Sequence, residues 1–379
     1  MSLLFYDDSP VFGGHEVMAL LGLEAVLAEF PEPVSFLAAA ANEKLCAKVA
    51  ASAAAHPHLR LETLSYHSSK FEALRNQLQA SRIRTLATRF RQLRPSLVVA
   101  IQGNIEHSSL ALQAARSAAI PVTSYLPVPH SNAAMGARLG ALRDVFASRL
   151  FRLPDSFITI TDEMARLLRL RGATAPIHIV YNGVDTSRFR PGDAAAACRQ
   201  LELPPDKILL GMIGRIEFRQ KQQQLLIQAL TTVPALGESC HLVFAGEGPD
   251  VAPLQALIRQ HHLSASVLPW CDPACLYQAL DALVIPSRYE GLPLVMLEAL
   301  ASGTAVLASD RDGMRDVLPP EWRFCPDDPA ALAAALAGFI AQGRPKPGAD
   351  LIARVRNTMS LASFRQTFSA TLRSLAGRA

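Results

Sequence analysis

Short apolar runs rich in β-branched residues alternate with longer segments of helical periodicity along the chain. This alternation is typical of parallel sheets built from strand–helix–strand units. In the first half, the runs that predict strands are 3–7, 33–38, 59–65, 97–102, 121–126, 156–161 and 177–181. In the second half, they are 208–213, 241–245, 266–268, 282–285 and 305–308. The pattern therefore predicts an α/β protein with two doubly wound, Rossmann-like parallel sheets.

Turn-forming residues separate the two series of strands. The segment 182–193 reads Asn-Gly-Val-Asp-Thr-Ser-Arg-Phe-Arg-Pro-Gly-Asp, which puts the domain boundary near 186–205. We expect an N-terminal domain over 1–190, completed by a C-terminal helix at 361–379, and a second domain over 200–360. Ligands bind at the carboxyl ends of parallel strands. Two such sheets facing each other would place the active site in the cleft between them.

Composition narrows the class of protein. No basic segment followed by an apolar one opens the chain, and no run of eighteen apolar residues occurs, so neither secretion nor a membrane span is expected. The six cysteines are scattered, as reduced thiols of a cytoplasmic protein are, and Cys271 and Cys275 lack a second ligand pair for zinc. A net charge of +4 without a stacking pattern of aromatic and basic residues argues against nucleic acid.

Basic residues are concentrated between Lys70 and Arg94. The segment 70–94 contains seven basic residues and one acidic residue, Glu72. Its apolar positions recur at near-helical spacing, so 70–94 is predicted as one amphipathic basic helix. A solvated outer face is the favoured interpretation. The alternative is peripheral docking at the inner face of a membrane, or on a lipid acceptor that carries phosphate.

The segment 286–303 combines two acids with the start of a helix. A predicted strand leads into it, Pro293 suits a first helical turn and Gly303 suits the helix end. The backbone N–H groups of Gly291, Leu292 and Leu294, with Pro293 between them, would then surround a site for a diphosphate. Glu290 and Glu298, on either side of it, can accept hydrogen bonds from sugar and ribose hydroxyls.

Three other places carry candidate chemistry. Arg215 and Lys221 follow the first strand of the second domain and can bind two phosphates. Gly13 and Gly14 follow the first strand of the chain, where glycine lets the backbone approach a ligand closely. His130 follows a later strand of the first domain; as a lone histidine it is as often an ordinary polar residue as a functional one.

The segment 286–303 resembles the E-x7-E signature of the family-4 glycosyltransferases, including its proline, glycine and small-residue positions. Residues 214–221 are similar to the G-R-x4-K loop of that family, except that Lys221 stands one residue late and Gln220 occupies the usual lysine position. Gly13-Gly14 is similar to its N-terminal glycine-rich loop, which puts Gly14 against the transferred sugar and phosphate. His130 stands where the family often has a histidine close to the sugar.

This resemblance implies a retaining glycosyltransferase of GT-B fold without a cofactor or a required metal, since no Asp-x-Asp motif ends a suitable strand. Arg215, Lys221, Glu290 and His130 would act in catalysis. The donor, a nucleotide diphosphate sugar, would contact Gly14, Arg215, Lys221, the 290–294 segment and Glu298. A UDP-sugar is the first expectation and GDP-mannose the second. The acceptor would be a glycan or a lipid-linked acceptor, in bacterial surface polysaccharide or glycoconjugate synthesis.

Three other classes share features with this sequence. A nicotinamide-dependent oxidoreductase is disfavoured because Gly246-Glu247-Gly248 lacks the third glycine of the dinucleotide fingerprint, position 251 being Val251. A sugar-nucleotide epimerase or phosphorylase shares the architecture without support from these motifs. A non-catalytic partner subunit that binds a nucleotide sugar stays open, because Lys221 is displaced.

Overall fold

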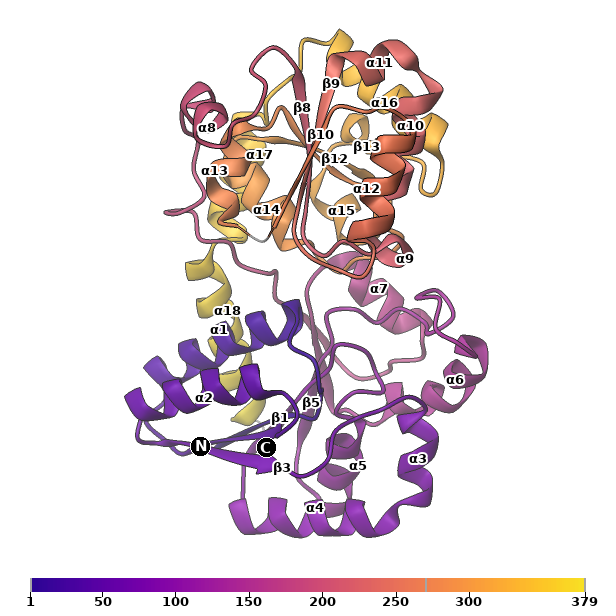
Figure 1. Cartoon of the computed structure of the whole chain (residues 1–379). Helices are drawn as coiled ribbons and strands as arrows, with labels where there is room; N and C mark the ends of the chain where they lie inside the picture. Colours follow the sequence, from indigo (N-terminus) through magenta and orange to yellow (C-terminus); the bar gives the residue numbers. More distant parts are fainter. Residues whose placement is uncertain (1, 270, 378–379) are drawn as a thin grey trace. The chain divides into compact units, whose positions relative to one another are not determined.

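The computed structural model describes residues 2–269 and 271–377 (Figure 1). Contacts between Cα atoms divide the chain into two compact units. Unit 1 comprises Met1–Asn182 with Ala362–Ala379, and unit 2 comprises Gly183–Leu361. Each unit is built around its own parallel sheet.

Unit 1 contains a seven-stranded sheet in the order β3-β2-β1-β4-β5-β6-β7. Every strand pair is parallel, and β1 lies between β2 and β4, so that Phe5 is opposite both Phe36 and Val99. All residues of β1 and β4 are buried, as expected where helices cover both faces of a sheet. The strands are β1 (Leu3–Asp7), β2 (Val34–Ala39), β3 (Leu59–Leu64), β4 (Leu97–Ile101), β5 (Val122–Tyr125), β6 (Ser156–Thr159) and β7 (Ile177–Ile179).

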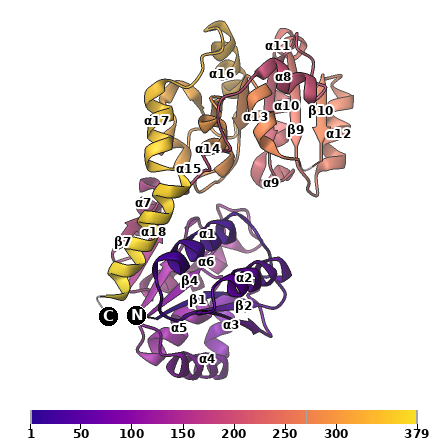
Figure 2. The same ribbon diagram turned by 90° about the vertical axis from the view of Figure 1, so that its left-hand side faces the viewer.

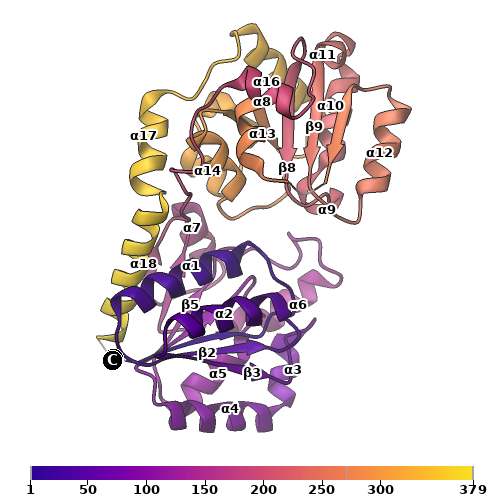
Figure 3. The same ribbon diagram turned by 60° about the vertical axis from the view of Figure 1, so that its left-hand side comes forward.

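The C-terminal helix α18 (Leu361–Ala376) packs on unit 1 (Figures 2 and 3). Phe368 is buried with its ring centroid 5.8 Å from that of Tyr125, and the Ser369 hydroxyl donates to Glu29. Gly22 leaves room for this helix, because a Cβ there would lie 2.5 Å from the Phe368 ring. The other helices of the unit are α1 (Gly14–Glu29), α2 (Glu43–Ala55), α3 (Glu72–Leu78), α4 (Ala80–Leu93), α5 (Ser109–Ala118), α6 (Gly140–Ala147), η1 (Ser148–Arg152) and α7 (Asp162–Leu170).

The prediction of one basic helix over 70–94 is wrong. Two helices, α3 and α4, meet at Gln79, whose backbone is not helical (φ −113°, ψ 48°). The break has a tertiary cause, because α3 is anchored by the hydrogen bond from Asn76 Nδ2 to Ser109 Oγ (3.0 Å), whereas the buried face of α4 packs in the core with α5. Part of the basic face also contacts the unit itself, since Arg89 pairs with Glu62 and Arg91 donates to the carbonyl of Ser117.

Unit 2 contains a six-stranded parallel sheet in the order β10-β9-β8-β11-β12-β13. Its strands are β8 (Ile208–Ile213), β9 (Cys240–Ala245), β10 (Ala265–Leu268), β11 (Ala282–Ile285), β12 (Ala305–Ser309) and β13 (Arg323–Phe324). The two-residue β13 was not predicted. The helices are α8 (Ala194–Gln200), α9 (Phe218–Lys221), α10 (Gln223–Thr232), α11 (Pro234–Ser239), α12 (Val251–Gln260), α13 (Pro273–Ala279), α14 (Leu294–Ala301), α15 (Asp312–Val317), η2 (Pro320–Trp322), α16 (Pro329–Ala341) and α17 (Ala349–Thr358).

The two sheets confirm the predicted architecture of two doubly wound α/β domains. The twelve predicted strands are present, and their ends differ from the prediction by at most two residues. In each sheet the strand order reverses once, between β1 and β4 in unit 1 and between β8 and β11 in unit 2. Such reversals are where open parallel sheets bind ligands, beyond the carboxyl ends of the strands.

Candidate functional site

The predicted phosphate- and sugar-binding residues of unit 2 surround the reversal point of its sheet. Arg215 and Lys221 follow β8, Glu290 follows β11, and Glu298 lies on the helix α14 that comes next. A small cavity of about 20 Å³ at this edge is lined by Arg215, Lys221 and Val295 together with residues of both strands. Residues distant in the sequence therefore meet at one position.

An ion pair between Lys221 and Glu290 joins the segment after β8 to the loop after β11. Lys221 Nζ lies 2.5 Å from Glu290 Oε1, and the Glu290 side chain is only 9% exposed, compared with 26% for Lys221. The backbone N–H of Glu290 donates to Asp312 Oδ2 (2.8 Å), which holds the loop that carries this carboxylate. The pair thus presents a cation and an anion side by side next to the start of α14.

On the short helix α9, Gln220 contacts the backbone of the loop after β11, and Lys221, one residue later than usual in the family, contacts Glu290. Gln220, at the usual lysine position, donates from Nε2 to the carbonyl of Tyr289 (3.2 Å). The carbonyl of Gln220 accepts a hydrogen bond from the backbone N–H of Arg288 (2.8 Å). Both contacts direct Gln220 toward the backbone of the facing loop, so the next residue supplies the charge.

Arg215 is held by its backbone and keeps an exposed side chain. The guanidinium is 62% exposed and lies 3.5 Å from Glu217. Its loop is clamped by the one after β9, because Ile216 N–H donates to the carbonyl of Glu247 (2.9 Å). Gly246, at φ +142°, is required there, since a Cβ would lie 2.1 Å from the carbonyl oxygen of Gly214. The glycines of 246–248 thus serve close backbone packing.

The N-terminus of α14 provides the third element of the site. The helix begins at Leu294, one residue later than expected, and Pro293 is its N-cap with φ −62°. Gly303 ends it in the left-handed region at φ +77°, as predicted, with Thr304 N–H donating to the carbonyl of Ala299 (2.9 Å). Its first turn carries the positive end of the helix dipole, which attracts phosphate oxygens.

Glu298 lies within α14 and has a partner that sequence reasoning missed. The hydroxyl of Tyr277, a buried residue of α13, donates to Glu298 Oε2 (2.7 Å). Burial raises the pKa of Glu298, and this hydrogen bond acts in the opposite direction, as does the charge of Arg188. Tyr277 orients the carboxylate and leaves Oε1 for a second donor.

Gly14 and His130 belong to unit 1. Gly14 is the first residue of α1, and a Cβ built on it would meet no atom within 4 Å, so the space beside it is open. His130 lies, partly buried, in the segment between β5 and α6. The backbone N–H of Gly13 donates to Glu16 Oε2 (2.7 Å), which fixes the turn that leads into α1.

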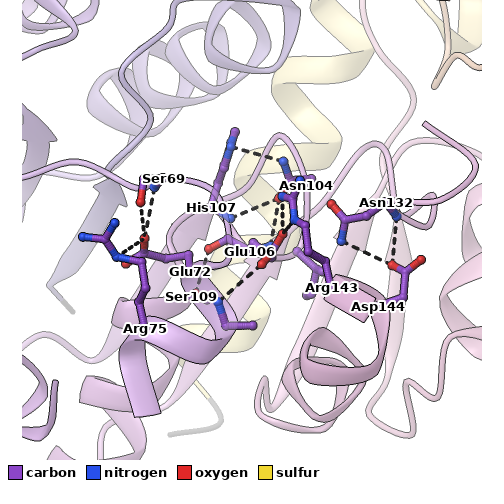
Figure 4. Close-up of polar contacts among 12 residues, drawn as sticks. Ser69, Glu72, Arg75, Asn104, Glu106, His107, Ser109, Asn132, Arg143 and Asp144 are labelled. Carbon is purple, nitrogen blue, oxygen red and sulfur yellow. Dashed lines mark hydrogen bonds and ion pairs between the residues drawn. The ribbon is translucent and has the colours of Figure 1, made fainter. Parts of the chain in front are cut away.

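A polar network after β4 was not predicted (Figure 4). Glu106 is completely buried and accepts a hydrogen bond from Arg143 Nε (2.8 Å), while its backbone N–H donates to Asn104 Oδ1 (2.9 Å). Burial, with the positive charge of His15 acting in the same direction, lowers the pKa of neighbouring His107 to about 4. The Gly103-Asn104 turn after a predicted strand was the available signal for this network.

Family models match both units of the chain. A family model described as Glycosyltransferase Family 4 matches residues 39–188, and one described as Glycosyl transferases group 1 matches residues 195–357. Together the two models span most of both units. The chain belongs to glycosyltransferase family 4.

Curated relatives match about half of this chain. D-inositol 3-phosphate glycosyltransferase 2 of Catenulispora acidiphila is 33% identical over 205 residues, 49% of this chain and 48% of that protein. D-inositol 3-phosphate glycosyltransferase of Mycobacterium bovis is 35% identical over 185 residues, 46% of this chain and 38% of that protein. In both cases the match spans less than half of the relative's length.

Solved structures match over the whole chain. Anabaena HepE, in a complex with UDP, has a TM-score of 0.76 at 18% identity, covering 99% of this chain and 100% of that one. Sucrose-phosphate synthase from Thermosynechococcus elongatus has a TM-score of 0.78 at 19% identity, and both chains are covered completely. At these identities the likeness concerns the fold, which is GT-B. Among the residues that the structure describes, no helix is long and apolar enough to cross a membrane.

Proposed function

We propose that the protein is a retaining glycosyltransferase that moves a sugar from a nucleotide diphosphate sugar to a glycan or a lipid-linked acceptor. The observation that carries the proposal is the Lys221–Glu290 pair beside Arg215 and the N-terminus of α14. Two cations and a helix dipole suit a diphosphate, and a carboxylate next to them suits the sugar hydroxyls. A site with these charged groups is unsuited to an apolar ligand.

The donor is proposed to be a UDP-sugar, with GDP-mannose as the second candidate. HepE, whose fold this chain shares, has been solved in complexes with UDP and with UDP-glucose. Glu298 would accept hydrogen bonds from the ribose hydroxyls through the oxygen that Tyr277 does not engage. Arg215 and Lys221 would bind the two phosphates, and Gly291 to Leu294 would lie along them.

The reaction breaks the bond between sugar C1 and the β-phosphate oxygen and forms a bond from C1 to the acceptor oxygen on the same face. The proton of the acceptor hydroxyl passes to the leaving phosphate, so no protein nucleophile is needed. Negative charge grows on the leaving phosphate, and Arg215, Lys221 and the N–H groups at the start of α14 would stabilise it. This electrostatic role requires neither a metal nor a cofactor.

Gly14 and His130 would act on the sugar from unit 1. The open space beside Gly14 supports a ligand at the start of α1, since a side chain there would occupy it. His130 would hydrogen-bond the transferred sugar. Both roles rest on the family resemblance and on the position of each residue after a strand.

The proposed setting is the cytoplasm, at the inner face of a bacterial membrane, in surface polysaccharide or glycoconjugate synthesis. Peripheral contact with an anionic membrane would use α3 and α4, where Arg84, Arg91 and Arg94 have exposed side chains. Because Arg89 pairs with Glu62, a smaller charge faces outward than the sequence alone suggests. A solvated surface is the competing interpretation.

Donor hydrolysis tests the proposal against a non-catalytic partner subunit. The protein would be incubated with UDP-sugars and GDP-mannose after a thermal-shift screen has identified the nucleotide sugar that stabilises it. An active transferase hydrolyses the donor slowly when water is the acceptor, and it releases the nucleotide diphosphate faster when a sugar acceptor is added. Stabilisation without any release, even with glycan and lipid-linked acceptors added, would indicate a binding subunit instead.

A further inference from the structure

Three potential metal ligands gather at the reversal point of the unit 1 sheet. Asp7 is the last residue of β1, and His15 and Glu16 lie in the first turn of α1. One ligand atom of each of the three side chains lies within 4.8 Å of those of the other two. The imidazole of His15 rests on Gly103, after β4, where a Cβ would lie 2.5 Å from its Cε1. Strand, helix and glycine therefore confine the three side chains.

Both carboxylates keep one oxygen without a hydrogen bond. Asp7 and Glu16 are completely buried, and Asp7 Oδ2 and Glu16 Oε1 have no hydrogen-bond partner among the described residues. Glu16 Oε1 is 2.8 Å from His15 Nε2, so a protonated imidazole forms an ion pair with Glu16, although neither atom has a hydrogen bond of suitable direction there. In the metal-free protein that proton compensates Glu16, whereas the buried Asp7 Oδ2 has no donor in the described part of the chain; a metal ion in place of the proton would compensate both carboxylates.

The second oxygen of each carboxylate is fixed by the backbone. Asp7 Oδ1 accepts from the N–H of Ser9 (2.9 Å), and Glu16 Oε2 accepts from the N–H of Gly13 (2.7 Å). These hydrogen bonds orient the carboxylates in the way that outer partners orient the ligands of a metal ion. The free oxygens are thereby directed to the same place as His15 Nε2.

We propose that Asp7, His15 and Glu16 bind a divalent transition-metal ion, with Zn²⁺ or Mn²⁺ as the fitting ions. Ligand atoms at roughly 2.0 to 2.2 Å from such an ion are separated from one another by about 3 to 4.2 Å, which three atoms lying within 4.8 Å of one another can reach with small shifts. One imidazole and two carboxylates suit these metals better than Ca²⁺ or Mg²⁺, which prefer oxygen alone. The two carboxylates also neutralise the charge of the ion.

The partly exposed side chain of His15 gives the ion a route to solvent. The His15 side chain is 17% exposed, whereas that of Glu16 is completely buried. Three protein ligands leave at least one coordination position for water or for an oxygen of a bound molecule. The ion would join the end of β1 to the start of α1 and so hold the Gly13-Gly14 turn in place. This role is separate from the transfer chemistry, for which no metal is required.

The test is a calorimetric titration of Zn²⁺, and separately of Mn²⁺, into the whole protein after removal of metals with a chelator. His15→Gln is the main variant, because this partly exposed residue is the safest to replace, and Asp7→Asn is the second. Glu24→Gln with His56→Gln is the matched control, a partly exposed histidine–glutamate contact of 3.9 Å in the same unit. Circular dichroism verifies that each variant is folded.

The wild type and the control should bind one equivalent of ion that His15→Gln lacks or binds at least about tenfold more weakly. The spectrum with Co²⁺ should show no thiolate charge-transfer band from this equivalent, which separates it from binding at the six free cysteines. Equal stoichiometry and affinity in wild type and His15→Gln would overturn the proposal. A thiolate band for the only tight equivalent would overturn it as well.

Discussion

Removing Lys221 should destabilise unit 2 more than removing the charge of Glu290. Lys221→Met leaves the Glu290 carboxylate, 9% exposed, next to no cation, whereas Glu290→Gln leaves a lysine that is 26% exposed and closer to water. Loss of one partner of a fully buried ion pair costs about 3 to 5 kcal/mol. Because Lys221 is partly exposed, we expect about 1 to 3 kcal/mol for Lys221→Met and about 1 kcal/mol for Glu290→Gln.

The double variant measures the pair itself. Lys221→Met with Glu290→Gln should cost less than the sum of the single changes, with a coupling free energy of about 0.5 to 3 kcal/mol. Urea unfolding followed by tryptophan fluorescence is the suitable assay, because both tryptophans, Trp270 and Trp322, lie within the limits of unit 2. Additive effects of the two substitutions would refute the reasoning.

A sequence swap provides the matched control for this cycle. Gln220→Lys with Lys221→Gln moves the lysine to the position usual in the family. Because Gln220 contacts the carbonyl of Tyr289, a lysine there would be directed toward backbone rather than toward Glu290, and stability should stay near that of Lys221→Met. Full recovery of wild-type stability would contradict the observed direction of the two side chains.

Four further predictions follow from the same geometry. Arg215→Ala and Glu298→Ala should each lower transfer at least about tenfold, from loss of a charge-assisted contact worth roughly 1.5 to 3 kcal/mol, and near-normal transfer in both would contradict the site. Glu290→Gln should harm turnover more than nucleotide binding, as separate kinetic and binding measurements would show; equal damage would argue against a sugar contact. Gly14→Val should unfold like the wild type, because its side chain meets open space, yet lose transfer; unchanged transfer would remove Gly14 from the donor site. Burial holds His107 neutral, with its pKa lowered to about 4 from an ordinary value near 6.5. Because the unfolded chain therefore binds the proton at a higher pH than the folded protein, the free energy of unfolding should fall by roughly 3 kcal/mol as the pH drops from 6.5 to 4. Calorimetry should show a weaker pH dependence for His107→Gln, and the same pH dependence in both proteins would refute this prediction.

The sheets were predictable because buried parallel strands are nearly continuous apolar runs. Leu3–Asp7, Ile208–Ile213 and Ala282–Ile285 begin and end where the pattern predicts. The two residues of β13 were too short to leave a pattern, and they became visible only through pairing with β12. The break at Gln79 was also hidden, because the apolar spacing continues across it and the cause lies in contacts of α3 with residues after β4.

The places of the candidate residues in the fold were predictable where a residue follows a strand closely. Arg215 and Glu290 have such places in the fold, and the helix that holds Glu298 and ends at Gly303 follows the same strand as Glu290. Tyr277 was not predictable, since its hydroxyl reaches Glu298 from another helix. The cluster of Asp7, His15 and Glu16 was missed for a related reason: the sequence does not show that these three side chains point toward one another.

Binding of UDP and of UDP-sugars to the wild type, Arg215→Ala and Glu298→Ala tests the central claim most directly. Isothermal calorimetry at a fixed salt concentration would give the dissociation constants, with GDP as the specificity control. The account predicts one site per chain in the wild type and at least about tenfold weaker binding in each variant. Equal affinity in all three proteins, or no binding of any nucleotide diphosphate, would contradict it.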